Sequence, residues 1–258
     1  KVDPEFVIFW NNRNIRRKNP GDLILAYNKF VNELPEKVRD KILLLLHTDM
    51  RDDNGTDIPA VIKELCPYRV MFTSKKLHER EMNYLYNIAD VTVNIASNEG
   101  FGLSGAESLM AGTPIINNVT GGLQDHCGFT KDNGQLLTED DFDAEWGSNH
   151  DGRYRKHGIW AKPVFPSNRS LQGSPMTPYI FDDRCKFEHV AERMKEWYNT
   201  PSVQRKDFGL EGRKFVTNPD VGMSAKEMGN RFIKHINTTL KNWKPRAKHT
   251  LYKIGESK

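Results

Sequence analysis

The chain has 258 residues, 37% hydrophobic and 28% charged, which is enough to bury a core and ordinary for a globular protein. No run of about 18 apolar residues occurs, so the sequence predicts no membrane-spanning helix. Cys66, Cys127 and Cys185 show no CxxC spacing, which argues against a zinc site or a disulfide framework and favours a reducing, cytoplasmic compartment. The net charge of +4 is too modest to indicate a nucleic-acid partner.

Positive charge gathers at two places in the chain. The first is a cluster of Arg13, Arg16, Arg17 and Lys18, and the second is the tail over residues 241–258. A charge run of this kind is usually a solvated face. For the tail, a patch for nucleic acid or for peripheral contact with an anionic membrane is the alternative interpretation.

Strands and helices are predicted to alternate over the first half of the chain. The strands, predicted from apolar runs, are 6–10, 41–47, 68–72 and 91–95. The helices, predicted from apolar side chains at helical spacing, are 22–34, 58–65 and 77–89. In the last of these we expect Leu77, Leu85 and Ile88 to point inward. The alternation predicts an α/β fold, a Rossmann-like parallel sheet covered by helices on both faces.

The alternation breaks after residue 118. Residues 121–179 are rich in Gly, Asp, Asn, Pro and Ser with little periodicity, so we expect an insertion at about 128–179. Further helices are predicted at 185–198, 203–216 and 223–243. We therefore expect a Rossmann-like domain over residues 1–218, with a C-terminal helix and basic tail over residues 219–258 packed on it.

The stretch from residue 91 to residue 117 is the centre of the predicted site. It reads as an apolar strand, a glycine-rich loop, a short helix and a second apolar strand, and Glu99 and Glu107 bracket the loop with E-x7-E spacing. A helix that begins at such a loop directs free N–H groups, and the positive end of its dipole, at whatever lies in front of it. The stretch therefore predicts an anion site, most often one for phosphate.

Two other motifs indicate different chemistry. Residues 100–105 fit the dinucleotide fingerprint G-x-G-x-x-G, but residues 96–99 separate them from the strand, and Val119 and Thr120, about 20 positions on, are not acidic. Asp141 and Asp143 form a D-x-D, the spacing with which some sugar transferases hold a divalent metal, inside an acidic run typical of an exposed loop. A dinucleotide-dependent oxidoreductase stays as an alternative, and no metal site is predicted.

A combination of distant segments is more specific. The sequence from Glu99 to Glu107 reads EGFGLSGAE and is followed by SLMAGTPII, while Asn12-Arg13 and Lys18 follow the first strand. This combination resembles the donor-binding, C-terminal half of a family 4-type retaining glycosyltransferase with the two-domain GT-B fold. The resemblance covers most of residues 6–118 and, more loosely, the helices from Cys185 on.

The resemblance implies a role for each site residue. In that family an Arg and a Lys grip the diphosphate of the donor, which carries over to Arg13 and Lys18. The second Glu, here Glu107, binds the ribose hydroxyls, and the first, here Glu99, binds the hydroxyls of the transferred sugar. Arg13, Lys18 and Glu99 are thus the catalytic candidates. The loop that faces the phosphates and sugar, and the strand end that lies against the base, carry over to Gly100, Phe101, Gly102 and Leu103, and to Met71, Phe72 and Thr73.

The resemblance also implies a reaction and its partners. The family transfers a hexosyl-type sugar from a nucleotide-sugar to a saccharide or other hydroxyl acceptor with retention of configuration. Fixed cations and a helix N-terminus can stabilise the departing diphosphate, so we expect no metal and no other cofactor. The N-terminal acceptor domain is expected to be missing, so the chain alone should bind donor and transfer poorly. A non-catalytic nucleotide-sugar binding module is the other alternative.

Overall fold

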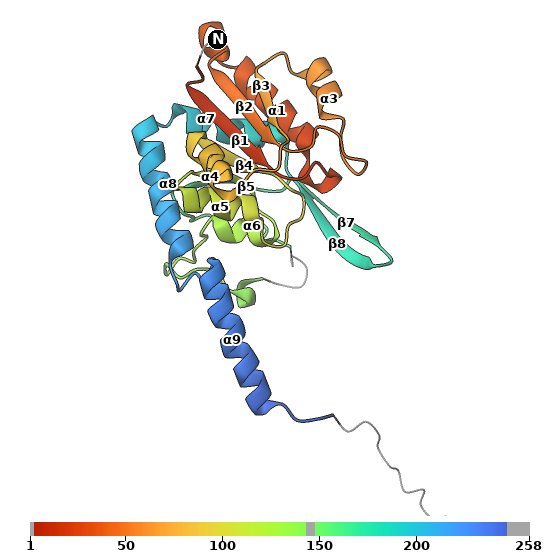
Figure 1. Cartoon of the computed structure of the whole chain (residues 1–258), viewed down its shortest axis with the longest axis vertical. Coiled ribbons are helices and arrows are strands. Elements are labelled where there is room, and N and C mark those ends of the chain that lie inside the picture. Colours follow the sequence, from red (N-terminus) through yellow and green to blue (C-terminus); the bar gives the residue numbers. More distant parts are fainter. Residues whose placement is uncertain (1–2, 143–147, 247–258) are drawn as a thin grey trace, which may run out of the picture.

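The computed structural model describes residues 3–142 and 148–246, and its centre is a six-stranded sheet (Figure 1). The strands lie in the order β3-β2-β1-β4-β5-β6, and every neighbouring pair is parallel. They are β1 (Phe6–Asn11), β2 (Ile42–His47), β3 (Val70–Thr73), β4 (Val91–Asn94), β5 (Ile115–Asn118) and β6 (Ala161–Val164). The predicted parallel sheet is confirmed.

Helices cover both faces of this sheet (Figure 1). One face carries α1 (Pro20–Asn32), α3 (Ile58–Leu65) and α7 (Phe187–Asn199). The other carries α4 (Glu79–Ile88), α5 (Leu103–Ala111) and α6 (Gly121–His126), with α8 (Ser202–Thr217) packed against α5. The short helices are η1 (Arg16–Lys18), α2 (Glu36–Arg39) and η2 (Glu139–Asp141). The predicted Rossmann-like architecture, with helices on both faces, is confirmed.

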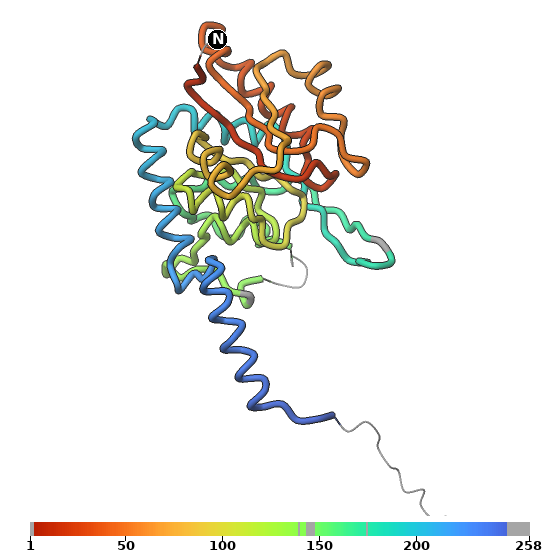
Figure 2. The backbone as a smooth tube through the Cα atoms, in the orientation of Figure 1, coloured from red at the N-terminus to blue at the C-terminus, as the bar shows by residue number. Residues whose placement is uncertain are grey.

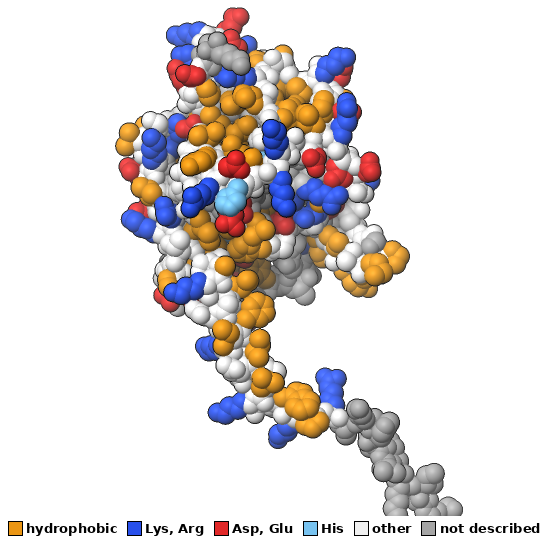
Figure 3. All heavy atoms as spheres, in the orientation of Figure 1, with side chains coloured by type: hydrophobic (Ala, Val, Ile, Leu, Met, Phe, Trp, Pro, Cys, Tyr) orange, Lys and Arg blue, Asp and Glu red, His pale blue; other side chains and the backbone are white. Residues whose placement is uncertain are grey.

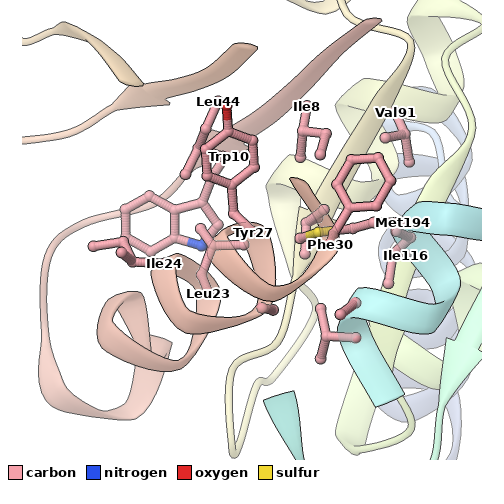
Figure 4. Packing of buried hydrophobic residues seen from close by; sticks show 14 of the residues in the cluster. Ile8, Trp10, Leu23, Ile24, Tyr27, Phe30, Leu44, Val91, Ile116 and Met194 are labelled. Carbon is pink, nitrogen blue, oxygen red and sulfur yellow. The ribbon is translucent and has the colours of Figure 1, made fainter. Parts of the chain in front are cut away.

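The central strand β1 is buried on both sides because all its core positions are apolar. Ile8 and Trp10 lie in the cluster formed with α1 and α7, together with Met194 (Figure 4). Phe9 faces the opposite way and packs edge-on against Tyr86 of α4, with ring centroids 5.1 Å apart. Burying side chains of this size contributes about 1.5–3 kcal/mol each. The core therefore fixes β1, and with it the start of the loop that follows.

Helix α4 differs from its prediction in the residues that face inward. It begins with a capping box, and Leu77 precedes it. Leu85 packs inward as predicted, together with Met82 and Tyr86. Ile88 is 57% exposed, so its predicted inward orientation is wrong. The inward residues are spaced three and four apart, and Ile88 falls outside the arc that this spacing defines.

The stretch over residues 121–179 contains regular structure. Besides α6 it holds β6, and it leads into the antiparallel hairpin of β7 (Asn168–Ser174) and β8 (Thr177–Arg184), which projects from the body (Figure 2). The strand β6 has only 4 residues, including Pro163, which an edge strand tolerates because one side needs no donor. Regular structure is therefore present in a stretch whose sequence shows little periodicity. Short strands that contain Pro and Gly leave no periodic signal.

Helix α9 (Ala225–Asn242) extends away from the body, and none of its residues is buried (Figure 3). A contact with the body lies near its start, where Arg231 Nη2 donates to the carbonyl oxygen of Asp220 at 3.1 Å. The extent of the helix agrees with its prediction. The helix was also expected to pack on the domain, but no side chain of α9 is buried. The domain boundaries stay a prediction, and the tail from residue 247 lies outside the described residues.

No helix within the described part of the chain combines the length and the apolar character needed to cross a membrane.

Candidate functional site

The carboxyl ends of β1 and β4 form the edge at which the predicted site residues gather. The strand β1 pairs with β2 on one side and with β4 on the other, so the strand order reverses between β1 and β4. In parallel α/β sheets, ligands bind at such a switch point, outside the carboxyl ends of the strands. The loops that follow β1 and β4 therefore carry the candidate site.

The loop after β1 brings two cations to Glu99. Lys18 Nζ forms a close ion pair with Glu99 Oε2, and Arg17 Nη1 lies 3.1 Å from the same oxygen. Arg17 also donates to the carbonyl oxygen of Asn98 at 2.8 Å. The side chains of Lys18 and Glu99 are only 9% and 12% exposed, so solvent screens this pair weakly. Residues 81 positions apart thus form one charged cluster.

Burial and charge oppose each other in this cluster. Burial alone would raise the pKa of Glu99, but the hydrogen bonds and charges of Lys18 and Arg17 outweigh it and hold that pKa below its ordinary value. Burial lowers the pKa of Lys18, with the bond and charge of Glu99 acting in the opposite direction. Glu99 is therefore an anion at neutral pH. It can accept hydrogen bonds from ligand hydroxyls and is not suited to donate a proton.

Glu107 is held by a different kind of partner. Its Oε2 accepts a hydrogen bond from the Tyr86 hydroxyl at 2.7 Å, and Asn11 Nδ2 donates to that hydroxyl oxygen at 2.8 Å. Burial, with the charge of Glu107 adding to it, raises the pKa of Tyr86, so the hydroxyl stays a donor. Glu107 is exposed, and no bond to its Oε1 is found among the described residues. One carboxylate oxygen is thus oriented by the protein and the other is open to a ligand.

The glycine turn between the two glutamates opens α5. Gly102 has a φ of +84°, in the left-handed region that favours glycine, and a Cβ there would come within 2.4 Å of Leu123 Cδ2. No side chain caps the α5 N-terminus, so its first N–H groups are available to an anion. Phe101 and Leu103 beside it are 40% and 68% exposed. The predicted loop, residues 100–103, therefore lies at the switch point.

Arg13 does not join the cluster around Glu99. It is exposed, and its Nε lies 2.8 Å from Asp52 Oδ2. The hydrogen bond to Asp52, reinforced by the charge of that carboxylate, raises the pKa of Arg13. The two predicted phosphate cations thus have different partners. Arg17, which the sequence allows as a substitute for Lys18, stands beside Lys18.

The residues predicted to face the base lie at the end of β3. Met71, Phe72 and Thr73 belong to this strand, two positions from β1 in the sheet. Register pairs Thr73 with His47 and His47 with Asn11, so all three strand ends share one edge. The structure therefore places the predicted base-side residues along the edge that carries the glutamates.

Sequence reasoning missed Tyr86 and His126. Tyr86 was overlooked because the inward face of α4 was misassigned. His126 is fully buried beneath the glycine turn, with its ring centroid 5.1 Å from that of Phe101, and neither ring nitrogen has a hydrogen-bond partner in the described structure. Burial lowers its pKa to about 4, so the imidazole is neutral. A histidine in the short polar segment GGLQDH gives no sequence signal of burial.

The acidic D-x-D motif is only partly described. Asp141 forms an ion pair with Lys131 at 2.8 Å, while Asp143 lies outside the described residues. Within residues 3–142 and 148–246, no group of three or more His, Cys, Asp or Glu side chains is arranged to hold a metal ion.

The fold and the edge define a class of protein: a Rossmann-like domain with a glycine turn and an uncapped helix N-terminus at its switch point. No protein-family model matches the chain. D-inositol 3-phosphate glycosyltransferase of Corynebacterium urealyticum is 28% identical to it over 191 residues, covering 66% of this chain and 44% of that protein.

Among solved structures, HepE of Anabaena in complex with UDP-glucose matches with a TM-score of 0.60 and 12% identity, over 90% of this chain and 49% of that one. The C-terminal domain of a glycosyl transferase group 1 family protein from Francisella tularensis matches with a TM-score of 0.53 and 14% identity, over 84% of this chain and 86% of that one. Both likenesses concern the fold.

The comparisons confirm the resemblance to GT-B glycosyltransferases, and the chain has the fold of one half of such a protein. The chain spans less than half the length of the curated relatives it matches. The activity, substrates and partners of a whole protein are therefore matters for proposal.

Proposed function

We propose that the chain is the donor-binding half of a glycosyltransferase and that a nucleotide-sugar binds between the loops after β1 and β4. One observation carries this proposal. Two anionic carboxylates, Glu99 and Glu107, stand on either side of an uncapped helix N-terminus, and two cations from a distant loop meet one of them. A nucleotide-sugar needs these groups in the same order. Its sugar hydroxyls need hydrogen-bond acceptors, its diphosphate needs cations, and its ribose hydroxyls need acceptors.

In the proposed complex the diphosphate lies against the N-terminus of α5 and accepts hydrogen bonds from Lys18 and Arg13. Arg13 would exchange Asp52 for a phosphate oxygen, which is open to it because the Arg13 side chain is 64% exposed. Glu99 accepts hydrogen bonds from the transferred sugar and Glu107 from the ribose. The end of β3 provides a surface for the base.

The proposed reaction needs a hydroxyl acceptor, saccharide or otherwise, and an acceptor domain. The acceptor oxygen forms a bond to the anomeric carbon while the bond from that carbon to the diphosphate oxygen breaks. The electron pair leaves with the diphosphate, and the proton of the hydroxyl follows it. We propose that a hexosyl-type sugar is transferred with retained configuration, as in the family that the E-x7-E element resembles.

We further propose that no metal takes part. Charge-assisted hydrogen bonds from Lys18, Arg13 and the helix N-terminus contribute about 1.5–3 kcal/mol each, and they act on the oxygens that gain charge as the diphosphate departs. A cytoplasmic location is proposed with the reducing compartment that three free, buried cysteines favour. Peripheral membrane contact through the basic tail also stays a proposal, and most of that tail lies outside the described residues.

The proposal is tested by thermal unfolding in the presence of EDTA with UDP, GDP, ADP and NAD. One nucleoside diphosphate at about 100 times its Kd should stabilise the chain by about 2.7 kcal/mol. The Lys18→Met variant should lose most of this gain. A gain that requires Mn²⁺ would contradict the metal-free proposal, and a gain with NAD alone would favour the oxidoreductase alternative.

A further inference from the structure

A cavity lies beside the candidate site, between η1, the start of α1 and the β7–β8 hairpin. It encloses about 490 Å³. The hairpin forms its outer wall as it projects from the body (Figure 1). The polar side chains that line it include Arg16, Arg17, Asn98, Gln172, Asp182 and Arg184. Its size lies within the range of small-molecule sites.

The wall formed by the hairpin is fixed to the loop that precedes Glu99. Asp182 Oδ1 accepts hydrogen bonds from Ser97 Oγ at 2.9 Å and from Asn98 Nδ2 at 2.7 Å. The backbone N–H of the fully buried Asp183 donates to the carbonyl oxygen of Ser97 at 2.8 Å. The end of β8 and the loop after β4 are therefore one rigid unit. A ligand in the cavity would lie in a defined position relative to Glu99.

The opposite wall is joined to the hairpin by an ion pair. Arg184 Nη2 lies 2.6 Å from Asp22 Oδ2, which connects the end of β8 to the first turn of α1. The hydrogen bond to Asp22 and the charge of that carboxylate raise the pKa of Arg184. This ion pair joins two of the segments that line the cavity. The charges of Arg184 and Asp22 neutralise each other.

The other charged side chains that line the cavity differ in how many hydrogen-bond and ion-pair partners they have. Arg17 is engaged by Glu99 and by the carbonyl oxygen of Asn98. Arg16 is exposed, and in the described residues its guanidinium has neither an ion-pair nor a hydrogen-bond partner. Asp182 uses only Oδ1 in the bonds described, which leaves Oδ2 as an open acceptor. Among the described residues that line the cavity, Arg16 is thus an unpaired cation, and Asp182 keeps an open carboxylate oxygen.

We propose that this cavity binds a sugar that carries one anionic group. The planar guanidinium of Arg16 can hold a phosphate or a carboxylate through two parallel hydrogen bonds. The free oxygen of Asp182 and the amide of Gln172 are suited to the hydroxyls of a sugar ring. A purely apolar ligand would leave both charges unpaired at a cost.

The cavity shares Arg17 and Asn98 with the surroundings of Glu99, so one hydroxyl of this sugar would approach the donor sugar. Its role as the acceptor rests on the proposed transferase function, whereas its binding does not. In that role the hydroxyl oxygen bonds to the anomeric carbon, and the diphosphate leaves with the electron pair and the proton.

The test is calorimetry on the full chain with glucose 6-phosphate, glucuronate, glucose and inorganic phosphate, each with and without UDP. Glucose 6-phosphate or glucuronate should bind at least about tenfold more tightly than glucose or phosphate, and UDP should not displace it. The first two ligands distinguish a phosphate from a carboxylate as the anionic group.

Variants assign the binding to the cavity. Arg16→Ala should weaken the anionic sugar by about tenfold or more and leave UDP binding unchanged, and Gln172→Ala should weaken it without altering the fold of the exposed hairpin. Arg213→Ala, an exposed arginine on α8, is the charge-matched control and should change neither. The assignment is overturned if UDP displaces the anionic sugar from the wild-type chain. It is also overturned if Arg16→Ala leaves the affinity for the anionic sugar unchanged. Anionic-sugar binding that depends on Arg16 in a chain that binds no UDP would support the cavity and refute the proposed transferase function.

Discussion

Glu99 and Glu107 stand at opposite ends of one glycine turn, and their surroundings make them different acceptors. Two cations meet Glu99, so a ligand hydroxyl must share a carboxylate that is already paired. Glu107 accepts a hydrogen bond from the neutral phenol of Tyr86, so no cation of the protein competes with a ligand for this carboxylate. Arg13 is a third case, because its partner Asp52 comes from a different loop. Substitution at these three positions should therefore affect different parts of a donor.

We predict that Glu107→Gln weakens uridine and UDP by a similar factor, because both contain the ribose. Arg13→Ala should weaken UDP and leave uridine nearly unchanged. A charge-assisted hydrogen bond of about 1.5–3 kcal/mol corresponds to roughly 10- to 150-fold in affinity. Calorimetry with both ligands measures the effects, and Arg51→Ala, which removes a neighbouring exposed arginine, is the control. Equal loss of both ligands in folded Arg13→Ala would contradict the assigned role.

His126 predicts a dependence of stability on pH. Its pKa falls from 6.5 to about 4 on folding because the ring is buried. Between these pH values the unfolded chain takes up a proton that the folded chain does not, so the free energy of unfolding falls as the pH falls. The loss reaches about 3 kcal/mol at pH 4, and the contribution is complete above pH 6.5.

We expect His126→Leu to remove this contribution to the pH dependence. Urea unfolding from pH 7.5 to pH 4 would measure it, with His235→Leu on the exposed α9 as a control for the loss of a histidine. Identical pH profiles for wild type and His126→Leu would show that the imidazole is not held neutral by the fold.

At the scale of elements, long apolar patterns in the sequence were sufficient to predict a helix or strand, and short patterns were not. The strand β2 is a continuous apolar run, and α3 begins and ends at the predicted residues. The strand β6 and the hairpin are different, because Pro163 and the polar, glycine-containing strand β7 carry no alternation. These elements form through tertiary pairing, which local sequence does not encode.

Helix α9 is amphipathic without a partner in the described structure. Its exposed apolar side chains recur at intervals of three to four residues and lie on one face of the helix. They are Met228, Phe232, Ile236, Leu240 and Trp243, each more than half exposed. An apolar stripe of this length indicates an interaction surface.

We predict that replacing Phe232, Ile236 and Leu240 together by Ser leaves the melting temperature unchanged, because none of them is buried. The same change should reduce self-association in sedimentation experiments. Met194→Ser in the core is the contrasting variant and should cost about 2–5 kcal/mol, since it leaves a cavity. A fall of several degrees in the triple variant would mean that α9 packs against the body in solution.

At the scale of the whole molecule, the sequence predicted a parallel sheet but not the order of its strands. The order decides that the loops after β1 and β4 are neighbours, and hence that Lys18 meets Glu99. The resemblance to a family joined these two segments before any geometry was known. It did not include Tyr86 or the hairpin, because their roles depend on contacts between segments far apart in the chain.

The strand order also has a consequence for how the chain is made. The strand β1 precedes β2 and β4 in sequence yet lies between them in the sheet. After β2 has paired with it, the other edge of β1 stays unpaired until β4 has left the ribosome. Parallel pairings across long stretches of chain form slowly and leave apolar edges open meanwhile. The hairpin that ties Asp183 to Ser97 is synthesised after every strand of the sheet. Nascent chains halted before residue 183 would therefore display the loop after β4 without the hairpin bonds to Ser97, and chaperone binding should be strongest over that interval.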